Sequence, residues 1–108
     1  MSWTVETLNS LVDAELERLP ADMLARFRYI SLLIEEFGLD RVREPHVKHL
    51  RGPLWEMRMK GRDGISRALY VTVVERRVVV VRVFVKKTQE TPGRDIELAL
   101  KRAKEILS

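Results

Sequence analysis

Hydrophobic and polar positions alternate with the two-residue period of β-strands in three consecutive runs of the chain, residues 54–60, 65–74 and 78–87. Asp63-Gly64, between the first two runs, is a typical hairpin turn, and three polar residues, 75–77, separate the second run from the third. Because connections this short join neighbouring strands of opposite direction, the pattern predicts a three-stranded antiparallel meander.

The first part of the chain shows the helical period instead. Apolar positions recur three or four residues apart over residues 7–19, and a second, wider apolar face covers residues 23–37. Pro20 suits the first turn of the second helix, and Gly38 suits its end. We therefore expect two helices joined at residues 19–20 as an antiparallel hairpin, preceded by a short strand at residues 2–6.

Two segments remain. Residues 40–53 are expected to form a loop or an extended linker, which ends at Gly52-Pro53. Thr91 as N-cap and Pro92 at the first helical position then begin a C-terminal helix with one apolar stripe. A chain of 108 residues with this order of elements is predicted to be one α+β domain, residues 1–108, with an N-terminal helical hairpin and a C-terminal helix packed on a small antiparallel sheet.

Charge is distributed unevenly between the two parts. The first 40 residues contain three Lys or Arg and eight Asp or Glu, whereas the rest contain 17 and eight. The surplus of cations therefore falls in and around the predicted strands, which favours a surface that binds a polyanion such as nucleic acid.

Composition excludes several classes of protein. The chain has no cysteine, which excludes disulfides, thiolate catalysis and cysteine-based zinc sites. The N-terminus lacks a basic region followed by an apolar run, so we expect no signal peptide. The longest apolar run is far too short to span a membrane. These observations favour a cytoplasmic protein.

The strand periodicity places several charged residues on common faces. Glu56, Arg58 and Lys60 share one face of the first strand, and Arg82 and Lys86 share one face of the third, opposite residues 81, 83 and 85. One interpretation is that Glu56 and the two arginines pair across strands on a solvated face. This interpretation explains less well why Arg58, Arg67, Lys86 and Lys87 are all present, because Glu56 is the only acid near them in the sequence.

Arg67 is the most informative single residue, because it has the same parity as the apolar residues of the middle strand. A charge on an otherwise apolar face requires a partner or a ligand. A phosphate group is one candidate, since arginines and a lysine can hold it and spread its transition-state charge. RNA supplies its own nucleophile, the 2′-OH, so cleavage needs a base, an acid and charge stabilisation but no metal or other cofactor.

Other candidate residues carry weaker signals. Tyr70 or Phe84 could stack on a base, although Phe84 is more typical of a core. His46 and His49 lie three residues apart without a third ligand, which disfavours a zinc site, but either could contact RNA.

Several segments together resemble the phage-derived branch of the RelE/HigB toxins, which are the toxin halves of type II toxin–antitoxin modules. The segments are Lys48-x-Leu50, LWEMR at 54–58, SRALY at 66–70, FVKKTQETP at 84–92 and IELALKRAKE at 96–105. The resemblance implies a RelE-like fold with a curved sheet, endoribonuclease cleavage of mRNA on the ribosome, inhibition of translation, and neutralisation by a helix-turn-helix antitoxin.

The resemblance also implies roles for individual residues. Arg58 and Arg67 match the basic strand residues of the family and would bind the phosphate. Lys86 or Lys87 would act as base or charge stabiliser, with Glu56 orienting Arg58. The expected catalytic residues are thus Arg58, Arg67, Lys86 and Lys87, and the expected RNA-binding residues are Lys48, Glu56, Lys60, Tyr70, Arg82 and Thr88.

The chain departs from the better-known RelE pattern at Glu56, where a second strand lysine would stand, and at Thr88, where a catalytic arginine would stand. The general base and acid are therefore open. A non-catalytic RNA- or ribosome-binding module on the same fold is the alternative function. A DNA-contacting protein is disfavoured, because the only strongly basic helical stretch is residues 101–104 and because the first part of the chain is acidic.

Overall fold

The computed structural model describes residues 2–43, 46–86 and 90–107. In chain order its elements are β1 (Thr4–Thr7), α1 (Ser10–Glu17), α2 (Ala21–Phe37), the short 3-10 helix η1 (Leu39–Arg41), β2 (Val47–Arg51), β3 (Leu54–Gly61), β4 (Gly64–Val73), β5 (Arg77–Lys86) and α3 (Gly93–Leu107).

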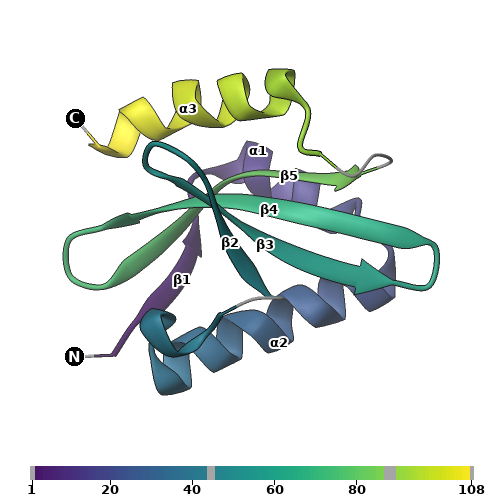
Figure 1. Cartoon of the computed structure of the whole chain (residues 1–108), viewed down its shortest axis with the longest axis horizontal. Coiled ribbons are helices and arrows are strands. Elements are labelled where there is room, and N and C mark those ends of the chain that lie inside the picture. The colour runs from purple at the N-terminus through teal and green to yellow at the C-terminus, as the bar shows by residue number, and fades with distance from the viewer. Residues whose placement is uncertain (1, 44–45, 87–89, 108) are drawn as a thin grey trace.

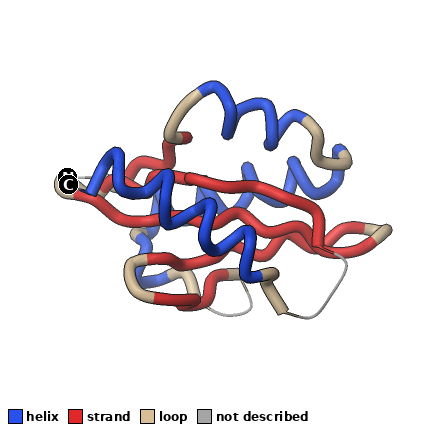
Figure 2. Tube along the Cα trace, turned by 90° about the horizontal axis from the view of Figure 1, so that it is seen from above, coloured by secondary structure: helices blue, strands red, loops and turns tan. Residues whose placement is uncertain are grey.

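The strands form one sheet in the order β1-β5-β4-β3-β2, which lies between helices (Figure 1). α1 and α2 cover one face, and α3 lies across the strands on the other (Figure 2). The predicted α+β class is confirmed, and β3, β4 and β5 form the predicted antiparallel meander. Within the described part of the chain, the helices are too short or too polar to cross a membrane.

The sheet has two strands more than the meander, and one of them makes it mixed rather than antiparallel. β1 pairs with β5 in parallel, with Thr4 opposite Arg77. The expected linker contains β2, which pairs antiparallel with β3 through the two-residue connection Gly52-Pro53. β2 is an edge strand with exposed Lys48 and His49, and charged residues are usual on such edges. Because this edge strand is polar, its sequence predicted a loop or linker rather than a strand.

The first helix begins later than the periodicity indicates. Thr7 is the last residue of β1, and the backbone N–H of Leu8 still donates to the carbonyl oxygen of Val80 in β5. α1 begins at Ser10, because the side chain of Asn9 accepts hydrogen bonds from the first free backbone N–H groups of the helix. The helical spacing of apolar positions thus extends back to Leu8, although the backbone of this residue is hydrogen-bonded to the sheet.

The two faces of the sheet bury separate cores. Met57, Met59 and Tyr70 belong to the core shared with α1 and α2. Leu54 and Leu69 belong to the core shared with α3. Alternate residues of each strand therefore serve different layers, as the strand periodicity predicts.

A β-bulge in β5 overturns part of the predicted facing of that strand. Leu69 pairs with Arg82 and Tyr70 with Val80, which leaves Val81 as the extra residue. Val81 therefore packs on the α3 side, whereas Val83, predicted to share its face, packs on the α1 side.

Side chains take the place of a neighbouring strand beside the bulge. β1 ends opposite Val80, so the outer edge of β5 beyond that residue lacks a strand partner in the described chain. The N–H of Val83 donates to the carboxylate of Glu15 at 2.9 Å, and Arg102 donates to the carbonyl oxygen of Val81 at 2.9 Å. α1 and α3 are thereby attached to the same edge.

Candidate functional site: a cation cluster around Glu56

Glu56 is the centre of the most concentrated group of charges on the sheet. It lies on β3 and is only 1% exposed. Its Oε2 atom accepts a hydrogen bond from Nε of Arg58 at 3.1 Å and forms a very close ion pair with Nη1 of Arg67. Its Oε1 atom accepts a hydrogen bond from the hydroxyl of Thr91 at 2.7 Å. One buried carboxylate thus holds groups from β3, β4 and the segment before α3.

The strand register explains why these side chains meet. Arg58 and Arg67 are directly opposite each other in the antiparallel pair of β3 and β4. Arg67 is in turn opposite Phe84 in β5, and Lys86 lies two residues further along the same face. Like charges facing each other across strands destabilise a sheet, so Glu56 is needed between them.

Burial differs among the three cations and changes their proton affinity. Arg67 and Lys86 are 5% and 6% exposed, whereas the side chain of Arg58 is 30% exposed. Burial lowers the pKa of Lys86, and the nearby guanidinium of Arg67 lowers it further. Burial also lowers the pKa of Arg67, although a guanidinium stays protonated in proteins. Lys86 is therefore the residue of this cluster that is best suited to give up a proton.

Two further lysines extend the positive surface. Lys60 follows Arg58 on the same face of β3 and is exposed. Lys48 is opposite Glu56 on the edge strand β2 and is also exposed. Both are free of the buried ion pairs described above, so they can contact the backbone of a nucleic acid that reaches the cluster.

Arg82 belongs to a different group of charges. Its guanidinium pairs with Glu15 of α1 at 2.8 Å and with Asp95 of α3 at 2.9 Å, and Arg102 of α3 pairs with the same Glu15 at 2.9 Å. Its guanidinium carbon also lies 5.6 Å from the ring centre of Phe84. The interpretation that Arg82 takes part in cross-strand pairing with Glu56 is therefore wrong, and its contacts attach both helices to β5.

Tyr70 lies where it cannot take the role that the sequence suggested. Its side chain is fully buried on the α1–α2 side of the sheet, the face opposite to Glu56. Its ring therefore cannot stack on an RNA base at the cation cluster. Lys87 and Thr88 lie outside the described residues, so their predicted roles are unchanged.

Thr91 belongs to the cluster around Glu56, whereas the sequence predicted only that it caps the last helix. It was expected to cap the last helix, but α3 begins at Gly93, and the backbone N–H groups of Asp95 and Ile96 bond to the carbonyl oxygen of Pro92. The hydroxyl of Thr91 reaches Glu56 instead. Nothing in the local sequence indicates this contact, because the two residues are 35 positions apart.

The histidines do not form a metal site with other residues that the structure describes. Nε2 of His49 is 2.9 Å from the carbonyl oxygen of Gly52, and its ring contacts Trp55 edge to face. His46 makes a similar contact with Tyr29 of α2.

Comparison with known proteins gives two kinds of similarity. The family model described as "Phage derived protein Gp49-like" matches residues 14–104. None of the curated protein sequences compared with the chain matches it.

Among solved structures, a mutant of the E. coli toxin RelE in the free state has a TM-score of 0.62 and 19% identity, with 99% of this chain and 100% of that chain covered. RelE in the archaeal RelE–RelB complex from Pyrococcus horikoshii OT3 has a TM-score of 0.60 and 20% identity, with 79% and 96% covered. These similarities confirm the expected RelE-like fold, and the match over residues 14–104 shows that the chain belongs to the family of phage-derived Gp49-like proteins.

Proposed function

We propose that this protein is the toxin of a type II toxin–antitoxin module and an endoribonuclease that cleaves mRNA, with the cluster around Glu56 as its phosphate-binding centre. The observation that carries the proposal is the meeting of Arg58, Arg67 and Lys86 on one face of a RelE-like sheet. Membership of a family of RelE-like fold supports the same conclusion.

The chemistry follows from what each group can do. In cleavage, a base takes the proton of a ribose 2′-OH, whose oxygen attacks the adjacent phosphorus. The bond from phosphorus to the 5′-oxygen breaks, and an acid donates a proton to that oxygen. Of Arg58, Arg67 and Lys86, Arg58 is the most accessible to an entering phosphate, and Arg67 adds positive charge beneath it. Both would stabilise the charge that develops on the phosphate oxygens, without a metal ion.

Glu56 would position this centre rather than transfer a proton. Its carboxylate is fixed by Arg58, Arg67 and Thr91, so it holds the two guanidinium groups at fixed angles. Lys86 or Lys87 would serve as base or as a further charge stabiliser. Lys48 and Lys60 would contact neighbouring phosphates.

The proposed partners are mRNA on the ribosome and a protein antitoxin. One structure of similar fold is a RelE–RelB complex, which supports an antitoxin as partner. Inducing the chain in a bacterial host is expected to stop growth, and primer extension on a translated message is expected to reveal new discrete 5′ ends. Arrested translation with intact mRNA would instead support a non-catalytic ribosome-binding module.

The role of Lys86 can be tested by the pH dependence of cleavage. If uncharged Lys86 is the base, the rate rises as the pH passes through its lowered pKa, because the deprotonated fraction increases. Lys86→Arg keeps the positive charge but cannot lose a proton, so the variant is expected to lose this rise. The measurement is the single-turnover cleavage rate of a short RNA between pH 6 and 10. An unchanged profile in Lys86→Arg would assign the base to another residue.

Thr91 is expected to act through Glu56. Thr91→Val keeps the shape of the side chain but removes the donor to Oε1, so Glu56 and the guanidinium groups lose one constraint. We expect the cleavage rate to fall about tenfold, the value for one lost hydrogen bond of ordinary strength, with RNA binding nearly unchanged. Thr91→Ser should restore the rate, because its hydroxyl can make the same bond. Equal loss in both variants would contradict this role.

A further inference from the structure

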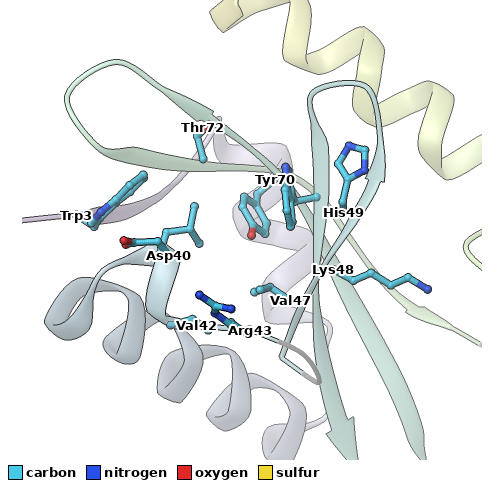
Figure 3. A pocket seen from close by; sticks show the side chains of 11 residues that line it. Trp3, Asp40, Val42, Arg43, Val47, Lys48, His49, Tyr70 and Thr72 are labelled. Atoms are coloured by element: carbon cyan, nitrogen blue, oxygen red, sulfur yellow. The ribbon is translucent and has the colours of Figure 1, made fainter.

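A concave site lies on the α1–α2 side of the sheet, opposite to the cation cluster. It is a cavity of about 660 Å³ between the segment that follows α2 and strands β2, β3 and β4 (Figure 3). Its volume is in the range of small-molecule sites. Trp55 lines it, whereas Glu56, the next residue of β3, points to the opposite face. The cavity is therefore separate from the cation cluster, although Lys48, proposed above to contact RNA, also lines it.

The inner wall of the cavity contains a polar atom without a partner. The side chain of Tyr70 is 0% exposed, and its hydroxyl makes no hydrogen bond with any residue that the structure describes. Figure 3 shows this hydroxyl directed into the space beside Val47 and Arg43. Burial raises the pKa of Tyr70, so the phenol keeps its proton and can donate a hydrogen bond. A buried donor left unpaired costs free energy that a ligand acceptor could recover.

The remaining walls indicate the shape and chemistry of a ligand. The indoles of Trp3 and Trp55 both line the cavity, and Leu39, Val42 and Val47 add aliphatic surface to its walls. Such walls suit a flat aromatic ring. The exposed guanidinium of Arg43 is a second donor and, with Tyr70, favours an acceptor at that end of the ligand, while Asp40 also lines the cavity and is itself an acceptor.

We propose that this cavity binds a planar aromatic molecule whose carbonyl or carboxylate oxygen accepts a hydrogen bond from the hydroxyl of Tyr70. The apolar walls supply most of the affinity, and the hydroxyl selects ligands that have an acceptor at the buried end. The inference stands independently of the proposed ribonuclease activity, because Tyr70 and Val47 face the side of the sheet opposite to the cation cluster.

Oxindole and indole form a suitable pair of probes, since oxindole differs from indole chiefly by one carbonyl oxygen. Binding can be followed in a ¹H–¹⁵N NMR titration of the full chain through the indole N–H signals of Trp3 and Trp55, the two tryptophans of the sequence. Oxindole is expected to shift both signals in a saturable manner. Tyr70→Phe should weaken oxindole binding roughly three- to tenfold and leave indole binding within about twofold.

Tyr29→Phe is the matched control, because Tyr29 is 49% exposed on α2 and does not line the cavity. It should bind both probes as the unchanged chain does. The inference is overturned if oxindole fails to shift the two signals at millimolar concentration. It is equally overturned if Tyr70→Phe leaves oxindole affinity unchanged or weakens both probes alike, since the hydroxyl would then select nothing.

Discussion

Replacing Arg58 by glutamine is expected to lower the rate of mRNA cleavage by about 100- to 1,000-fold, the usual effect of removing one donor to a developing negative charge. Arg58 is the best choice for this test, because its side chain is 30% exposed and its removal leaves Glu56 paired with Arg67. The sheet should therefore remain folded. Arg67 is less suitable, since it is 5% exposed and its removal would also disturb the core.

The measurement is growth after induction together with the single-turnover cleavage rate of the purified variant. Arg28→Gln is the matched control, because this arginine is exposed on α2, on the far side of the sheet. It removes one positive charge from the chain but none from the cluster, so it should remain toxic. If Arg58→Gln arrests growth and cleaves mRNA as fast as the control, the cluster is not the site of cleavage.

Glu56→Gln is expected to cause the largest loss of stability, about 3–5 kcal/mol, because it removes the buried carboxylate that pairs with the buried guanidinium of Arg67. Arg67 and Lys86 are nearly inaccessible to water, so the solvent cannot compensate for the missing carboxylate. For a chain of this size the melting temperature should fall by more than about 10 °C. Thermal unfolding followed by circular dichroism at neutral pH measures the change.

Glu6→Gln provides the comparison, since Glu6 also pairs with an arginine, Arg77, but at the surface. The two side chains are 38% and 35% exposed, so we expect a loss of at most about 1 kcal/mol. Similar losses in the two variants would mean that the carboxylate of Glu56 is not needed to hold the cations together.

Local patterns predicted the elements that depend on local interactions. The meander followed from alternation and from the turn at Asp63-Gly64, and the last helix followed from its single apolar stripe. β1 was expected near residues 2–6, but its parallel partner, β5, lies more than 70 positions away and no short-range pattern indicates it. β2 was missed because one apolar residue facing the core, Val47, is too weak a signal in a polar segment.

In the candidate site, too, local patterns predicted some features, whereas others depend on residues that are distant in the sequence. Alternation placed Glu56 and Arg58 on one face of their strand and Lys86 on one face of another, and the apolar parity of Arg67 correctly indicated that this arginine requires a partner. That partner proved to be Glu56 itself. The contact with Thr91 depends on where the chain turns after β5, and the burial of Tyr70 depends on the helices opposite. Neither could be read from strand periodicity.

The parallel pairing of β1 with β5 fixes the order in which the molecule can be completed during its synthesis. The first strand cannot find its neighbour until residues 77–80 have been made, and Glu15 cannot meet Arg102 until α3 exists. Such non-local contacts form late, because the chain between them must first be closed into a loop. The hydrogen bond from Thr91 to Glu56 likewise forms only after the segment before α3 has been made. A chain proposed to attack translating ribosomes would thus gain its full set of stabilising contacts only after α3 has left the ribosome that produces it.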